Sequence, residues 1–244
     1  MEKVCIPVPH IYIQSLVLDK KRRLLHGITF TPEMLFTYNI ETGQVTDHGI
    51  IGSGIETGQP EKPALDEKGQ LWCTWGVTRS FMYDTGPKPI RLLSLDPDTN
   101  KLTHYKHGVP LLGPGDNGRI DNFLTGTDGF LYLGSHAGGL YRLDTKTADV
   151  QYLGKPAPGK RMAGMKYGSD GMIYLATGLS PSHIVRFDPK KDTFEVLGPI
   201  RDQKTGDQAF QIHDMCITKD GTIYAGENDN FARSGYLWQC KINN

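Results

Sequence analysis

The chain has 244 residues, and a chain of this length can bury a sizeable core as one domain over residues 1–244. Its 27 lysines and arginines equal its 27 aspartates and glutamates, so it lacks the basic surplus that nucleic-acid or anionic-membrane partners require. No apolar run approaches the roughly 20 residues of a membrane span. Residues 1–5 show no signal-peptide pattern, and the localisation stays open.

The clearest structural unit lies at residues 127–153. Asp128-Gly129 predicts a hairpin turn, because glycine adopts a positive φ without strain. Short apolar strands are expected at 130–134, 140–144 and 150–153, separated by a small loop and a polar turn. With one strand before the turn, this unit is a four-stranded antiparallel meander.

The same unit recurs along the chain. Its turns are predicted, in order, at 19–23, 66–70, 128–129, 170–171 and 220–221. Apolar strands follow at 24–25, 71–73, 131–133, 173–175 and 223–225. Third strands with polar ends follow at 35–43, 92–100, 140–147, 184–191 and 236–243. Fourth strands close the first four units at 45–51, 102–105, 150–153 and 194–197.

Equivalent turn glycines at 69, 129, 171 and 221 lie 60, 42 and 50 residues apart. Four strands in each such period predict the blades of an all-β β-propeller. A β-sandwich also has many short strands, but it lacks this repetition. We therefore predict a single propeller domain of five four-stranded blades.

The fifth unit has no fourth strand of its own. Residues 4–8 read as an unassigned strand, so we expect them to complete the last blade and close the ring, which removes exposed sheet edges. That pairing would bring Cys5 near Cys240; a disulfide needs matching register, and free thiols are the default expectation. Cys73 and Cys216 fall in strand patterns, and no C-x-x-C spacing suggests zinc.

The meander sorts its connections onto two ends. One end collects the tight polar turns. The other collects the second-to-third loops and the connections between blades, where binding and catalysis are usually found. Candidate site residues at this second end are His10, His26, Trp75, Arg79, Tyr83, Arg119, Asp121, Arg161, His136 and His213.

Structural roles compete with functional ones for these residues. Polar groups in a propeller channel often bind only water or neighbouring blades. Trp75 and Tyr83 either stack on a sugar or pack their own loop. The run from Glu227 to Asn230 resembles a loop for a divalent cation such as calcium, yet it lacks calcium-loop spacing. No cofactor is indicated by any other motif.

The turn-and-strand signature DG-x-[LI]-Y-x-[GA], at 128–134, 170–176 and 220–226, resembles the repeat of lyase-type propellers. These include virginiamycin (streptogramin) B lyase-like proteins and propeller polysaccharide lyases, and the similarity extends over nearly the whole chain. It implies proton transfer by His or Tyr, with Arg or a cation against a uronate carboxylate. Such enzymes commonly have seven blades, from which five would depart.

The leading prediction is therefore a carbohydrate-active lyase that performs β-elimination at a uronic acid. His136 or His213 would be the base and Tyr83 the acid, while Arg119 or Arg161 would hold the carboxylate. The other candidates, His10, His26, Arg79, Asp121 and Trp75, would contact substrate.

Two alternatives remain open: a non-catalytic module that binds a glycan or protein, and a propeller fragment or engineered ring without activity. The expected partner is a carbohydrate or other small ligand, with no nucleic acid or membrane, bound by a monomer.

Overall fold

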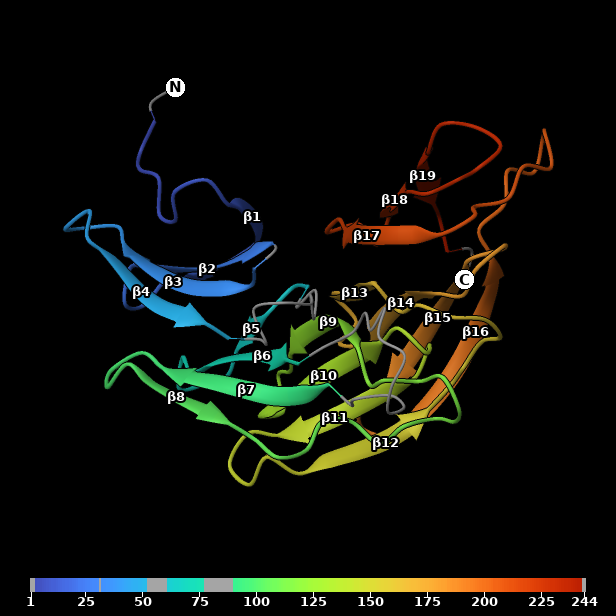
Figure 1. The fold of residues 1–244 in the computed structure, drawn as a ribbon. Coiled ribbons are helices and arrows are strands. Elements are labelled where there is room, and N and C mark those ends of the chain that lie inside the picture. The colour runs from blue at the N-terminus through green and yellow to red at the C-terminus, as the bar shows by residue number, and fades with distance from the viewer. Residues whose placement is uncertain (1–2, 31, 52–60, 77–89, 243–244) are drawn as a thin grey trace. The chain divides into compact units, whose positions relative to one another are not determined.

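The computed structural model describes residues 3–30, 32–51, 61–76 and 90–242 (Figure 1). These residues form strands and no helix, so no helix among them could cross a membrane. The chain separates into two compact units. The first unit contains residues 1–131 and 143–150, and the second contains residues 132–142 and 151–244.

Five antiparallel sheets follow one another along the chain, which is the five-bladed β-propeller predicted from the repeat. The first sheet contains β1 (Tyr12–Asp19), β2 (Leu24–Phe30), β3 (Met34–Asn39) and β4 (Val45–Ile50). The second contains β5 (Ala64–Leu65), β6 (Leu71–Trp75), β7 (Arg91–Asp96) and β8 (Lys101–His104). The third contains β9 (Ile120–Thr125), β10 (Phe130–Ser135), β11 (Leu140–Asp144) and β12 (Val150–Gly154). The fourth contains β13 (Gly164–Tyr167), β14 (Ile173–Thr177), β15 (His183–Asp188) and β16 (Thr193–Pro199). The last contains β17 (Ile212–Ile217), β18 (Ile223–Glu227) and β19 (Leu237–Cys240).

The predicted hairpin turns are confirmed by backbone geometry. Gly69, Gly129, Gly171 and Gly221 all have φ between 79° and 87°, a left-handed conformation that favours glycine. In the first sheet Arg23 takes this conformation instead, with φ of 57°. The same left-handed turn conformation thus recurs in all five sheets. It sets where the first and second strands of each sheet join.

The predicted closing strand is not confirmed. The last sheet contains β17, β18 and β19 only, and residues 3–8 belong to no strand. Val4 and Ile6 are 69% and 60% exposed. All four cysteines are free thiols, which agrees with the default expectation for Cys5 and Cys240.

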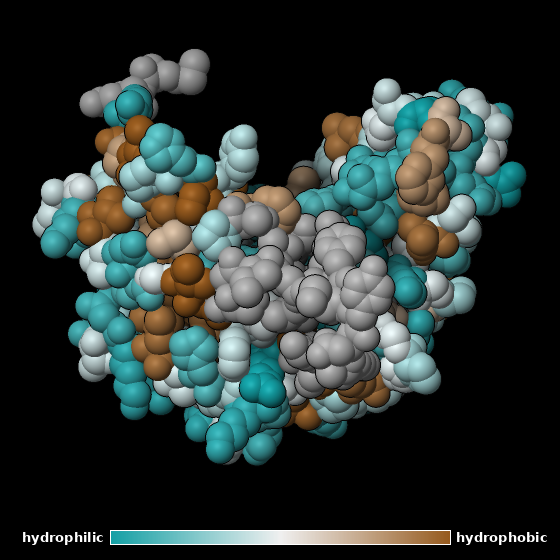
Figure 2. Space-filling view, in the orientation of Figure 1, coloured by the Kyte–Doolittle hydropathy of each residue, from teal (hydrophilic) through white to brown (hydrophobic). Residues whose placement is uncertain are grey.

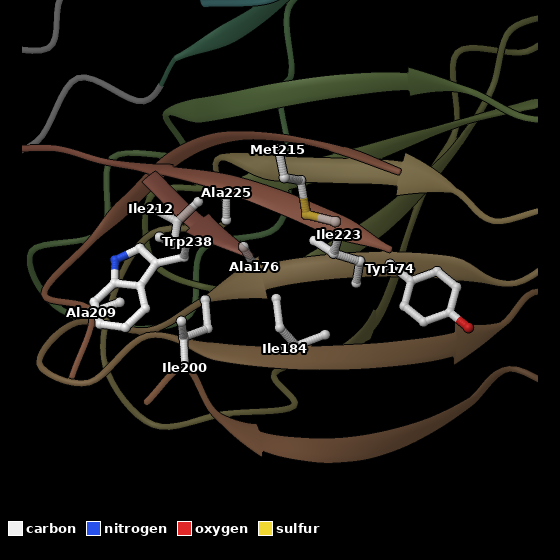
Figure 3. Packing of buried hydrophobic residues seen from close by; sticks show 10 residues of the cluster. All are labelled: Tyr174, Ala176, Ile184, Ile200, Ala209, Ile212, Met215, Ile223, Ala225 and Trp238. Carbon is white, nitrogen blue, oxygen red and sulfur yellow. The ribbon is translucent and has the colours of Figure 1, made fainter. Parts of the chain in front are cut away.

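Each unit has its own apolar core. In the first unit, a cluster joins the first two sheets; its buried members are Ile28, Leu35, Ile51, Leu71, Cys73, Leu93 and Leu95. In the second unit, Ile184, Ile212 and Trp238 belong to a cluster that joins the fourth and last sheets (Figure 3). Burying each such side chain contributes about 1.5–3 kcal/mol, which makes packing between successive sheets the main source of stability.

The tight-turn ends carry ion pairs between successive sheets. In the first unit, the Arg22 guanidinium donates to both Asp98 oxygens at 2.7 and 2.8 Å and to Asp19 at 3.1 Å. In the second unit, Arg142 donates to both oxygens of Asp192 at 3.0 Å. Arg22, Asp98 and Asp192 lie in turns, whereas Asp19 ends β1 and Arg142 lies in β11.

Candidate functional site

In the second unit, the connections at the end opposite the tight turns are hydrogen-bonded to one another. The backbone N–H of Arg161 donates to the carbonyl of His136 at 2.7 Å. The carbonyl of Arg161 accepts from the Gly178 N–H at 3.1 Å and from the Thr177 hydroxyl at 2.9 Å. The loop after β10, the connection before β13 and the loop after β14 are therefore tied together through Arg161.

The same network continues toward the last sheet. The N–H of Ser180 donates to the Phe210 carbonyl at 2.8 Å, and the N–H of Asn228 donates to the Gln211 carbonyl at 3.0 Å. The Gln211 side-chain amide donates to Asn228 at 3.0 Å and to Asp229 at 2.9 Å. We call these connected segments, residues 136–139, 155–163, 178–182, 209–211 and 228–235, the loop end of the second unit.

His136 and Arg161 are neighbours at this loop end. The hydrogen bond joins their backbones, and one nitrogen of each side chain, Nδ1 of His136 and Nη2 of Arg161, is buried. Arg161 adopts a left-handed φ of 71°. His136 and Arg161 are both half-buried, and the Nδ1 of His136 lies within the protein. An imidazole and a guanidinium are thus presented by adjacent segments.

His213, the other candidate base, lies within β17 rather than in a loop. The register of β17 shifts between Ile212 and Asp214, and His213 occupies this bulge with its side chain half-buried. Its neighbour Asp214 lies 3.8 Å from the Lys166 amine of β13. His213 is thus carried by a strand, whereas His136 belongs to the loop end.

The first unit holds a separate buried charge cluster. The Arg119 guanidinium donates to Glu61 at 2.7 Å, and its Nε lies 3.4 Å from Asp121. The side chains of Arg119, Glu61 and Asp121 are only 13%, 8% and 0% exposed. The sequence analysis placed Arg119 and Asp121 among the candidate site residues, but Arg119 is already neutralised by the carboxylates of Glu61 and Asp121. It is therefore poorly suited to hold a third.

Trp75 packs within the first unit. Its ring contacts the His104 imidazole edge-on at 5.0 Å between centroids, and the Arg91 guanidinium lies 5.4 Å from the ring centroid. Trp75 also packs against the apolar cluster of that unit. Arg79 and Tyr83, which the sequence analysis placed beside it, lie outside the described residues.

His26 is buried rather than positioned at a surface. Its Nδ1 lies 2.9 Å from the Thr37 hydroxyl, which lies 2.8 Å from Nε2 of His48. Burial lowers the pKa of His26 to about 4 and also lowers the pKa of His48. His26 is thus a neutral core residue at neutral pH, whereas His10 is exposed on the segment before β1.

The Glu227 carboxylate accepts hydrogen bonds from several segments at the end of the last sheet. One carboxylate oxygen accepts from the Phe210 N–H at 2.8 Å and from Asn230 at 2.9 Å. The other accepts from Arg233, the Tyr236 N–H and Trp238 at 2.7, 3.0 and 3.1 Å.

Burial would raise the pKa of Glu227, but the hydrogen bonds, above all from Arg233, lower it to about 2. Both carboxylate oxygens of Glu227 thus accept hydrogen bonds from donors of the protein itself. The described residues contain no group of three or more metal-ligating side chains.

No family model and no curated protein matches the chain. Among solved structures, it is similar to the extracellular domain of a putative hybrid two-component system from Bacteroides thetaiotaomicron, at 19% identity and a TM-score of 0.60. That match covers 93% of this chain and 27% of the other, so the chain spans about a quarter of that relative.

Two further similar structures are shorter propellers. A putative gluconolactonase matches at 12% identity with a TM-score of 0.57, covering 94% of this chain and 75% of that one. The virginiamycin B lyase of Staphylococcus aureus matches at 12% identity with a TM-score of 0.50, covering 95% and 85%. At these identities the similarities show the β-propeller fold, and their functions vary.

Proposed function

We propose that the loop end of the second unit binds a saccharide that carries a uronic acid and cleaves it by β-elimination. The observation that supports this most is the pairing of His136 with Arg161 through a 2.7 Å backbone hydrogen bond. A general base and a carboxylate-binding fork on adjacent segments are the two groups that this reaction requires first.

His136 would take the proton from the carbon next to the carboxylate. Arg161 would bind that carboxylate with two N–H groups and stabilise the negative charge that spreads onto it. The C–H electron pair becomes the new C=C bond as the neighbouring C–O bond breaks. The leaving oxygen keeps its electron pair and takes a proton from a general acid.

Gln211, Asn228 and Asp229 give this loop end neutral and negative groups for sugar hydroxyls. Their mutual hydrogen bonds at 2.9–3.0 Å hold the groups in fixed positions. Hydroxyl recognition by side-chain amides and carboxylates is the usual polar complement in a saccharide site. The base and the carboxylate-binding residue would therefore be flanked by groups that orient the sugar.

The test is incubation with polygalacturonate and with alginate while the ultraviolet absorbance of the unsaturated product is followed. His136→Gln should lower kcat about 100-fold or more, because a positioned base contributes at least this much. Arg161→Lys should raise KM and also lower kcat, because Arg161 would both bind the carboxylate and stabilise its developing charge. His213→Gln is the matched control and should leave kcat unchanged.

A second candidate function is binding without turnover. It is favoured by the similarity to an extracellular domain of a putative signalling system. Calorimetric titration with the same saccharides separates the two functions. Binding that requires Arg161 but forms no product would favour the binding module, and neither binding nor product would refute both.

A further inference from the structure

The loop between β18 and β19 carries an aromatic side chain that stands in solvent (Figure 1). Phe231 is 92% exposed, more than any other large apolar side chain in the described part of the chain. A single exposed apolar residue is ordinary on a protein surface and needs no explanation by itself. Phe231 differs because its loop is held in place by hydrogen bonds and its ring lies on a second ring.

Side-chain hydrogen bonds fix the backbone on both sides of Phe231. The Asn230 amide donates to Glu227 at 2.9 Å, and the Asn230 side-chain oxygen accepts from the Ala232 N–H at 2.9 Å. Beyond these residues, the Arg233 guanidinium donates to Glu227 at 2.7 Å. The loop conformation that presents the Phe231 ring is thus set before a ligand arrives, which lowers the ordering cost of binding.

The Phe231 ring packs against Phe210. The two ring centroids are 5.5 Å apart and the ring planes meet at 74°, an edge-to-face arrangement. Phe210 is half-buried in the connection before β17, and its N–H donates to Glu227 at 2.8 Å. Both rings are therefore held at the loop end of the second unit. We call Phe210 and Phe231 the aromatic platform.

Hydrogen-bonding groups lie directly beside the aromatic platform. Gln211 follows Phe210, and its side-chain amide donates at 2.9 Å to Asp229, two residues before Phe231. The same two segments thus make both the ring contact and this polar contact. An apolar ring bordered by amide and carboxylate groups suits a sugar, whose C–H face covers the ring while its hydroxyls reach the polar groups.

The apolar area available here is small. Figure 2 shows separate hydrophobic patches among hydrophilic surface over the C-terminal strands. A stable protein–protein interface buries about 800 Å² on each partner, far more than two phenylalanine rings offer. The aromatic platform therefore favours a sugar ring over a folded protein partner.

The aromatic platform also lies near the proposed catalytic pair. The Arg161 carbonyl accepts from the Gly178 N–H at 3.1 Å. The Phe210 carbonyl accepts from the Ser180 N–H at 2.8 Å. These two amides are two residues apart, which corresponds to at most about 7 Å of extended chain. The carbonyl oxygens of Arg161 and Phe210 are therefore no more than about 13 Å apart, a distance that a short oligosaccharide can span.

We propose that the aromatic platform is a second sugar-binding subsite, on which one ring of an oligosaccharide stacks while another ring lies at His136 and Arg161. This inference deepens the proposed function and rests on it for the class of ligand. One molecule has to fill both subsites, so the substrate is an oligosaccharide or polysaccharide rather than a monosaccharide. Stacking uses the C–H face of the sugar and not its carboxylate, so this subsite accepts neutral and acidic rings alike.

The experiment titrates tetragalacturonate and the neutral galactotetraose by calorimetry, in the His136→Gln background so that the acidic ligand is not cleaved. Phe231→Ala and Phe231→Leu should each weaken binding of both ligands about tenfold, because neither side chain offers a ring face. Phe231→Trp should bind both ligands at least as tightly as Phe231 does. Arg161→Lys should weaken only the acidic ligand. Product formation from tetragalacturonate is followed separately with His136 intact.

Tyr152→Ala is the matched control, because Tyr152 is also exposed and packs on a second ring, Tyr141, at 5.3 Å, but lies in β12 outside the loop end. It should leave binding unchanged. Binding that depends on Arg161 but not on Phe231 would overturn this inference and leave the proposed function intact. Binding of the neutral ligand that needs Phe231, without product from the acidic one, would support the subsite and refute the lyase.

Two further outcomes would overturn the inference. If Phe231→Leu binds as well as the wild-type side chain, the contact is a general apolar one and no sugar ring stacks there. If neither tetrasaccharide binds, both the subsite and the proposed function are wrong.

Discussion

Replacing Glu227 with glutamine is expected to destabilise the protein strongly. The Glu227 side chain is fully buried and its two oxygens accept hydrogen bonds from five donors, one of them the Arg233 guanidinium. Glutamine keeps one acceptor but places an NH₂ group against donors. Removing one partner of a buried ion pair costs about 3–5 kcal/mol, and we expect a loss of this size for Glu227→Gln at pH 7.

The pKa of Glu227 gives an independent magnitude. The carboxyl changes from its ordinary pKa of 4.5 to about 2 in the folded protein, which corresponds to about 3 kcal/mol of stability. Because the folded-state pKa is the lower one, this stabilisation is complete above pH 4.5 and is lost as the pH falls toward 2. Roughly 2 kcal/mol of it should be gone by pH 3.

The assay is urea unfolding, followed by circular dichroism and tryptophan fluorescence, at pH 7 and pH 3. The difference between wild type and Glu227→Gln should shrink by about 2 kcal/mol at the lower pH. Glu195→Gln is the matched control, because Glu195 pairs with Arg186 at an exposed position and such pairs contribute at most about 1 kcal/mol. A Glu227→Gln protein as stable as the control, or a difference independent of pH, would refute the reasoning.

Three further outcomes are expected. Gly134→Ala should cost about 1–3 kcal/mol in urea unfolding, because its Cβ would collide with the backbone oxygen of Met162. Gly226→Ala, whose Cβ would have no atom nearer than 3.8 Å, is the control, and equal losses of stability in the two variants would contradict this packing. The His26 imidazole should titrate near pH 4 in NMR spectra, with stability lost as the pH falls from 6.5 toward 4; an ordinary pKa would contradict its burial. A thiol reagent should label exposed Cys216 rapidly but Cys73 only after unfolding, since burial raises the pKa of Cys73 to about 12; equal rates would contradict this.

Sequence patterns predicted the sheets well because each hairpin is encoded locally. The residue before Gly129 or Gly171 and the positive φ of the glycine itself define the turn, and the apolar run after it defines the strand. The pairing of residues 4–8 with the last sheet has no such local code. Their alternating apolar pattern is compatible with a strand, but the partner lies more than 200 residues away in the sequence.

The candidate site was predictable as a set of connections but not as individual contacts. The up-and-down order of the meander placed His136 and Arg161 at the same end of their sheets, whereas the hydrogen bond between them depends on loop conformation. Neutralisation of Arg119 depends in the same way on the folded connections. Glu227 looked like part of a cation loop because Asn228, Asp229 and Asn230 follow it, whereas in the structure its oxygens accept hydrogen bonds from Asn230 and Arg233.

The contrast between the two ends of each sheet has a consequence for related chains. The short hairpins leave no freedom in length, since one added residue would shift the strand register. The opposite connections are joined by hydrogen bonds between segments and accommodate insertions more readily. Homologues should thus vary in length at the loop end, and a foreign segment grafted between β10 and β11 should leave the hairpin ends unchanged.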